Sequence, residues 1–160
     1  MIDFDIYALD ANLSPLLVQE AKNWKARGDS EGTLADALYR KLQTTKEPAV
    51  GVSMTLNFVK SVTTSQVVEA FNDAFSTCDP ALTKQFKDTL HLAVGDHGMK
   101  VGEVVEFTWL TGGGLVISSR GKTEGVFFGV DIEKRLLEVY LDPKISVSPS
   151  LLKSIDGFLA

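Results

Sequence analysis

The stretch VGVSMTLNF, residues Val50–Phe58, is the clearest structural signal in the chain. Every second residue in it is apolar, and the residues between them are small or polar. This period of two is typical of a β-strand that buries one face and exposes the other. The residues predicted to share the buried face are Val50, Val52, Met54, Leu56 and Phe58.

Three more strands are predicted around this one. Val104–Leu110 and Leu115–Ser119 flank Thr111–Gly114, a glycine-rich segment typical of a hairpin turn. We expect these two strands to pair antiparallel, in one sheet with Val50–Phe58. A short strand is also predicted at Ile2–Leu9, where apolar residues alternate with acidic ones.

Helix signals fill the segments between these strands. Ser14 before Pro15 and the pair Thr63 and Gln66 are typical helix starts, since their side chains can cap free backbone amides. Helices are predicted to begin near residues 14, 30, 63, 79, 126 and 148. The fifth is predicted to run from Val126 to Leu141, with Phe128, Ile132, Leu136 and Tyr140 on one face. Antiparallel strands with helices grouped between them predict an α+β domain, an open antiparallel sheet with a helical layer on one face.

Composition narrows the possible classes of protein. The chain has 160 residues, 44% of them hydrophobic, and a formal net charge of −5. We expect one soluble domain over residues 1–160 and no nucleic-acid partner, because phosphate binding needs clustered Lys and Arg. No apolar run reaches the roughly 18–20 residues of a membrane span, and the start resembles no signal peptide. We therefore expect an intracellular location, cytoplasmic or plastid.

Few residues favour metal or cofactor chemistry. His91 and His97 are the only histidines, and no cysteine or acidic residue stands at a ligand spacing beside them. Gly112–Gly114 precedes a strand rather than a helix, which favours a hairpin turn over a phosphate loop. We predict no metal and no cofactor.

Seven segments of the chain carry apolar and turn residues in a recognisable order: Phe4–Ala8, Val52–Leu56, Thr63–Phe75, Gly102–Phe107, Gly121–Gly125, Leu136–Leu141 and Val147–Pro149. In order and spacing they resemble the chalcone-isomerase family, especially its fatty-acid-binding branch. The resemblance covers nearly the whole chain. It implies an open, curved antiparallel sheet with a helical layer and a ligand cleft between them.

The same resemblance argues against catalysis. The family's enzymes stabilise an enolate with an Arg on an early strand, a Lys on the central strand, and a Tyr and an Asn further on. Here the Lys position falls on Asn57, the Tyr position on Gln66 and the Asn position on Asp73, whose anion would oppose an enolate. The Arg lies on a strand that in the family precedes Ile2–Leu9 and is missing here. The resemblance therefore implies no catalytic residues.

The prediction is a non-catalytic protein that binds a fatty acid or similar apolar carboxylate in the sheet–helix cleft. Its ligand-binding residues are predicted to be Asn57, Gln66, Asp73, Lys122 and Thr123. Lys60, Arg120 or Lys122 are candidate anchors for the carboxylate. Two alternatives remain open: a chalcone–flavanone isomerase (an intramolecular lyase) with an atypical site, and a ligand-free accessory protein.

Overall fold

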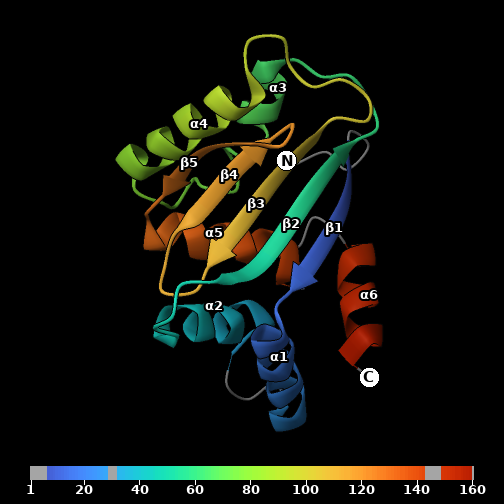
Figure 1. Ribbon diagram of the computed structural model, residues 1–160, viewed down its shortest axis with the longest axis vertical. Helices are drawn as coiled ribbons and strands as arrows, with labels where there is room; N and C mark the ends of the chain where they lie inside the picture. Colours follow the sequence, from blue (N-terminus) through green and yellow to red (C-terminus); the bar gives the residue numbers. More distant parts are fainter. Residues whose placement is uncertain (1–6, 29–31, 143–148, 160) are drawn as a thin grey trace.

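The structure, a computed structural model, describes residues 7–28, 32–142 and 149–159. Within these residues the strands form one antiparallel sheet in the order β1-β2-β3-β4-β5 (Figure 1). The strands are β1 (Tyr7–Leu13), β2 (Val50–Phe58), β3 (Val104–Leu110), β4 (Leu115–Ser119) and β5 (Lys122–Phe127). The helices are α1 (Pro15–Arg27), α2 (Leu34–Thr44), α3 (Thr64–Glu69), α4 (Pro80–Val94), α5 (Val130–Leu141) and α6 (Pro149–Leu159). The predicted α+β class and the open antiparallel sheet are confirmed.

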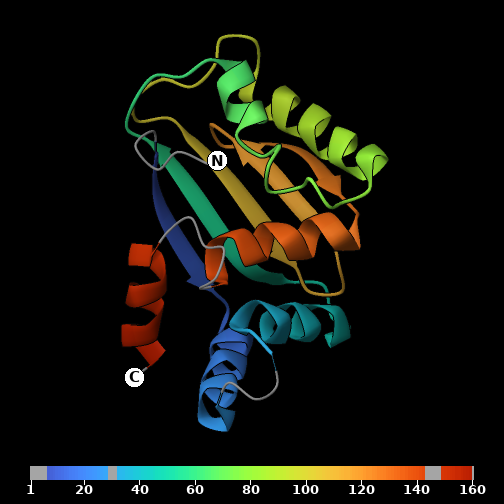
Figure 2. The ribbon, with the colours of Figure 1, turned by 180° about the vertical axis from the view of Figure 1, so that it is seen from behind.

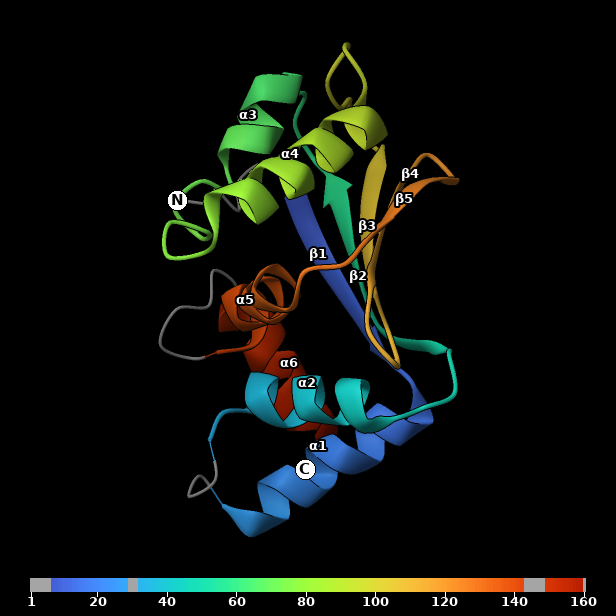
Figure 3. The same cartoon turned by 90° about the vertical axis from the view of Figure 1, so that its left-hand side faces the viewer.

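The helices lie on one side of the sheet (Figure 3). Seen from behind, α5 crosses in front of the strands, with α3 and α4 on one side of it and α2 on the other (Figure 2). Helix α6 runs beside β1, at the edge of the sheet, and α1 continues from the end of β1. The opposite face of the sheet carries no helix, as Figure 1 shows for the described residues.

Strand β2 lies in the interior of the sheet, and its alternation sets the two faces. Val52, Met54 and Leu56 are buried beneath the helices, as predicted. Val50 is an exception, with 56% of its surface exposed, because the β2–β3 register shifts between Val50 and Val52. Gly51 occupies this irregularity, where a Cβ atom would lie 2.2 Å from Leu42 Cδ2. The helix α2 can approach the sheet closely here because residue 51 has no side chain.

The open face of the sheet is held by polar side chains that bond across neighbouring strands. Two of the bonds join residues that lie opposite each other in the register, and one joins a diagonal pair, because Asn57 lies opposite Ala8 and Asp10 lies opposite Thr55. These bonds join Asn57 to Asp10 (3.0 Å), Thr55 to Glu106 (3.1 Å) and Ser53 to Thr108 (3.3 Å). The outward residues of β1, β2 and β3 thus form a polar surface whose side chains partner one another.

Aromatic rings fill much of the space between the sheet and helices α3 and α4. Phe86 packs edge-on against Phe75 and Phe71, with ring centroids 4.9 and 5.5 Å apart. Phe71 also meets Phe107 of β3 edge-on at 5.8 Å. All four rings are buried, and edge-to-face packing of this kind adds to the free energy gained from burial.

The helix predicted to begin at Val126 begins later in the structure, because the chain first forms strand β5. Val126 and Phe127 belong to this strand, and the helix α5 begins only at Val130. The cause is the preceding turn. Arg120 and Gly121 have positive φ angles of 52° and 78°, and Ser119 pairs directly with Lys122. A two-residue turn with both φ angles positive returns the chain as a hairpin, so the following residues become a strand.

One consequence is that Phe128 does not lie on the inner face of a helix. It follows β5 and is 70% exposed. The other residues predicted to share its face, Ile132, Leu136 and Tyr140, are buried on α5 as expected.

Three smaller differences concern element ends. The first described strand runs to Leu13 instead of Leu9, and the predicted residues Ile2 to Ile6 lie outside the described part. Helix α2 starts after Thr33, whose capping box with Asp36 sets the first turn. Helix α3 ends at Glu69, after which backbone bonds change to i→i−3 spacing, as from Asn72 to Glu69.

Candidate functional site

A groove lies at the β1 edge of the sheet, between β1, α1 and α6. Its volume is about 410 Å³, within the range of small-molecule sites. The strand contributes its helix-facing residues Leu9, Ala11 and Leu13, and α1 contributes Val18 and Ala21. The close approach of β1 to α1 follows from the sequence, because Ser14 ends the strand and caps the helix that starts at Pro15.

Helix α6 forms the other wall of the groove. The residues that it contributes recur every three or four positions, so they share one face of the helix. They are Leu151, Ser154, Ile155, Phe158 and Leu159. Among the described residues that line the groove, only Asp10, Asn12 and Ser154 have polar side chains, and that of Asp10 bonds to Asn57 on the open face of the sheet. The groove therefore suits an apolar molecule and offers few groups for acid–base chemistry.

The predicted binding residues lie elsewhere in the fold. Asn57 belongs to the open face of the sheet, where its side-chain amide donates to Asp10 Oδ2. Gln66 accepts a 2.8 Å hydrogen bond from the backbone amide of Thr63 as part of the capping box of α3. Asp73 is exposed in the turns between α3 and α4.

The remaining two predicted residues are on β5. Lys122 is exposed at the start of this strand, and the backbone of Thr123 pairs with Ser118. Two strands, β3 and β4, separate them from Asn57 on β2. The structure does not bring Asn57 and Lys122 together, and neither residue lines the groove at β1.

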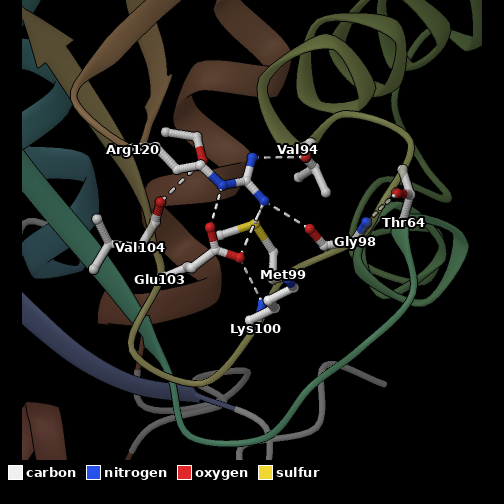
Figure 4. A network of polar contacts seen from close by, with 9 residues as sticks. Thr64, Val94, Gly98, Met99, Lys100, Glu103, Val104 and Arg120 are labelled. Carbon is white, nitrogen blue, oxygen red and sulfur yellow. Dashed lines mark hydrogen bonds and ion pairs between the residues drawn. The ribbon is translucent and has the colours of Figure 1, made fainter.

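Arg120, a candidate anchor for a ligand carboxylate, bonds to the protein itself (Figure 4). Its guanidinium donates to the carbonyl oxygens of Val94 (2.9 Å) and Gly98 (2.7 Å). It also binds both carboxylate oxygens of Glu103, through Nε and Nη2. The hydrogen bond from Arg120 lowers the pKa of Glu103 to about 2. Arg120 thus connects the end of α4 to the loop before β3. Lys60, another candidate anchor, is exposed just after β2.

The glycine-rich turn between β3 and β4 binds a carboxylate of the chain itself. Glu133 is buried, and its two oxygens accept 2.9 Å hydrogen bonds from the backbone amides of Gly114 and Gly129. The carbonyl of Glu133 accepts a further bond from Trp109 Nε1 at 2.8 Å. The hairpin turn was predicted correctly, and its contact with Glu133 fastens it to the first turn of α5.

Two buried tyrosines face each other between β1 and α5. The hydroxyl oxygens of Tyr7 and Tyr140 are 3.5 Å apart. Burial, and then the neighbouring Tyr7, raise the pKa of Tyr140 well above its ordinary value. A phenol in this setting stays protonated at neutral pH and does not act as a base.

The described part of the chain contains neither a metal-binding cluster nor a helix that could span a membrane. No group of three or more His, Cys, Asp or Glu residues is placed to hold a metal ion there. The ring of His91 pairs with Asp96, with 3.3 Å between Nε2 and Oδ1. No described helix is long and apolar enough to cross a membrane.

The groove differs from the predicted site because its lining is mostly apolar and lies at the edge of the sheet, whereas the predicted residues are polar. The sequence indicates the groove only through apolar and small residues. Leu151, Ile155 and Phe158 recur at helical spacing near the end of the chain, and Ala11 and Ala21 are small. Such residues are ordinary core residues in most proteins, and only the placement of α6 beside β1 makes them a wall of a groove.

Comparison with known proteins identifies the family. A family model described as chalcone isomerase-like matches residues 35–150. This span begins in α2, contains β2 to β5 and α5, and reaches the start of α6. No curated protein matches the chain. The match covers well over half of the residues, and the chain belongs to the chalcone isomerase-like family.

Proposed function

We propose that this protein binds a fatty acid or a similar apolar carboxylate, without catalysing a reaction, in the groove between β1, α1 and α6. The observation that carries the proposal is the lining of the groove, whose described residues are apolar except for Asp10, Asn12 and Ser154. Burying methylene groups there contributes about 0.8 kcal/mol each, which is enough to hold an acyl chain without specific polar contacts.

The arrangement of polar groups supports a non-catalytic role. Stabilising an enolate requires cationic groups and hydrogen-bond donors that converge on the developing charge. Arg120 is engaged by Glu103 and two backbone carbonyls, and Asn57 by Asp10. Asp73 is an exposed acid. Arg120 and Asn57 already bond within the protein, and the three groups lie on different parts of the fold.

A pair of substitutions on β1 tests the proposal. Ala11 faces the groove, whereas Ala8 is exposed on the open face of the same strand. We expect Ala11→Trp to fill the groove and to weaken binding of a fluorescent fatty acid at least tenfold. Ala8→Trp makes the same chemical change on the other face, and we expect it to leave the affinity unchanged.

Fluorescence titration measures the affinity of the wild type and of both variants for the fatty acid. Circular dichroism should show that both variants remain folded. Native mass spectrometry of the purified wild type should detect a bound acyl chain. The proposal is wrong if the wild type binds no fatty acid, or if Ala11→Trp and Ala8→Trp bind equally well.

A further inference from the structure

We infer that the β1 edge of the sheet binds an extended peptide of a partner protein, which adds a strand beside β1 and places every second side chain in the groove between β1, α1 and α6. This inference goes beyond the proposed function, because an acyl chain uses only the apolar walls, whereas a peptide also uses the backbone of β1. Two observations carry it, the direction of the β1 backbone groups and the charge on the open face of the sheet.

The register shows which backbone groups of β1 point to the edge of the sheet. The amide of Ser14 donates to the carbonyl of Gly51 at 2.8 Å, so these two residues form a hydrogen-bonded pair. In an antiparallel ladder, such pairs alternate with pairs that share no hydrogen bond. Counted back from Ser14 in steps of two, the even-numbered residues of β1 therefore bond to β2. The residues whose amides and carbonyls point away from β2 are Leu9, Ala11 and Leu13.

These outward backbone groups have no partner in the described part of the chain. Strand β1 stands at the end of the strand order, with β2 as its neighbour. Helix α6 lies beside β1 (Figure 1), but no described backbone hydrogen bond joins it to Leu9, Ala11 or Leu13. The same three residues line the groove and are partly exposed, so a ligand can reach them. A row of unpaired amides and carbonyls at a sheet edge is a template for another strand.

The spacing of the unpaired groups matches an extended peptide. Residues two apart in an antiparallel strand repeat at about 7 Å, so the donors and acceptors from Leu9 to Leu13 extend over about 14 Å. A second antiparallel strand carries complementary groups at the same interval, and each residue of β1 can then exchange two hydrogen bonds with it. An acyl chain has no groups that could pair with this row.

The walls of the groove determine the inward side chains of the peptide. Residues directly opposite each other in a sheet share one face, so the peptide residues opposite Leu9, Ala11 and Leu13 point toward the helices. There they meet the wall formed by Ile155 and Phe158 of α6. Phe158 has 65% of its surface exposed, and covering this ring with apolar side chains favours binding.

The other side chains of the peptide lie on the open face of the sheet, where the charge is negative. The charged residues of β1, β2 and β3 are Asp10 and Glu106, both acidic. Asp10 is exposed on this face, where it accepts a hydrogen bond from Asn57, and it belongs to the strand that the peptide would join. Lys or Arg at the outward positions would meet an opposite charge. The expected ligand is therefore an extended segment in which apolar residues alternate with Lys or Arg.

The first experiment uses a synthetic peptide in which Lys and Val alternate, with both ends capped, and two N-methylated forms of it. Titration calorimetry measures binding to the wild-type chain. Methyl groups on the Val amides block hydrogen bonds to β1, and we expect the affinity to fall at least tenfold. Methyl groups on the Lys amides point away from β1, so this form should bind within about threefold of the parent peptide. Equal affinity of the two methylated forms, or no binding of the parent peptide, overturns the inference.

The second experiment removes one of the edge amides from the protein. Ala11→Pro deletes an amide that points to the edge and leaves the hydrogen bonds to β2 in place, as proline in an edge strand can. We expect the peptide to bind at least fivefold more weakly, and unchanged affinity counts against the inference. Circular dichroism checks the fold of this variant, and the methylated peptides test the same bonds on the unaltered protein.

The third experiment tests the preference for cationic outward residues. Asp10→Asn should weaken binding of the Lys and Val peptide by about two- to fivefold, as expected for an exposed ion pair. A peptide with Thr in place of Lys has no charge at these positions and should bind both proteins alike. An equal loss for the two peptides would show that charge does not select the ligand.

Competition separates this inference from the proposed function. The peptide should displace a bound fluorescent fatty acid, because both occupy the groove. If the peptide binds without displacing the fatty acid, the inference is wrong and the proposed function stands. If no fatty acid binds but the methylated peptides differ as expected, the proposed function fails and the inference stands. If sedimentation shows a dimer that Ala11→Pro converts to a monomer, a second copy of the chain occupies the edge and the peptide inference is wrong.

Discussion

Removing the side chain of Arg120 should destabilise the protein strongly for a residue at the surface. The guanidinium is the hydrogen-bond donor for the carbonyls of Val94 and Gly98, and both of these residues are buried. Depriving a buried carbonyl of its partner costs about 1–3 kcal/mol, at the lower end here because water can enter. The ion pair with Glu103 adds at most about 1 kcal/mol, since the two side chains are 37% and 26% exposed. We expect Arg120→Ala to lower the free energy of unfolding by about 3 kcal/mol.

Urea unfolding followed by circular dichroism measures this change. For a chain of this size, a loss of about 3 kcal/mol lowers the Tm by about 6–12 °C. Arg40 is an exposed residue of α2 with no side-chain hydrogen bond recorded in the described part of the chain, and Arg40→Ala is the control, expected within about 0.5 kcal/mol of wild type. Arg120→Lys should fall between wild type and Arg120→Ala, because one ammonium group cannot reach all the acceptors. A loss below about 1 kcal/mol for Arg120→Ala, or one equal to that of Arg40→Ala, would refute the reasoning.

Three other predictions concern the carboxylate of Glu103, the glycines Gly51 and Gly157, and chalcone cyclisation. The pKa of Glu103 is lowered to about 2 from its usual 4.5, so its contribution to stability is complete above pH 4.5 and disappears as the pH falls toward 2. Urea unfolding at several pH values should therefore show a smaller loss of stability toward low pH in Glu103→Gln than in wild type. Parallel pH profiles for the two proteins would count against this prediction. Gly51→Ala should destabilise the protein by about 1–3 kcal/mol, because the added Cβ would collide with Leu42. Gly157→Ala has open space around it on α6 and should stabilise the protein by about 0.5–1 kcal/mol. Urea midpoints measure both changes, and equal effects would contradict the packing described. Chalcone cyclisation, followed by absorbance, should run no faster with the protein than in buffer, and an acceleration that Asn57→Ala abolishes would restore the isomerase alternative.

Local signals predicted much of the fold because they act within a few residues. The alternation in Val50–Phe58 and the capping pair Thr63 and Gln66 depend on neighbouring atoms, and both are present in the structure. Strand β5 was missed because its conformation depends on the turn before it. A helical spacing of apolar residues from Val126 competes there with pairing to β4, and pairing prevails once Arg120 and Gly121 form the turn.

The candidate site was harder to predict than the fold. A groove depends on how far apart two walls lie, and no local pattern in the sequence encodes that distance. Leu9 and Leu151 are far apart in the chain, and their shared groove follows from the way α6 lies beside β1. The family resemblance identified the fold correctly, but it directed attention to Asn57, whose side chain bonds on the open face of the sheet.

The order of the strands has a consequence for how fast each part of the sheet forms. Strands β3, β4 and β5 follow one another closely, joined by residues 111–114 and 120–121, whereas residues 14–49 separate β1 from β2 and residues 59–103 separate β2 from β3. Closing a longer loop costs more chain entropy, about 0.6 kcal/mol for each doubling, so the three late strands have the kinetic advantage. In pulse-labelled refolding, we expect backbone amides of β3–β5 to be protected before those that join β1 to β2. The edge that bears the proposed ligand groove would then be the last part of the sheet to assemble.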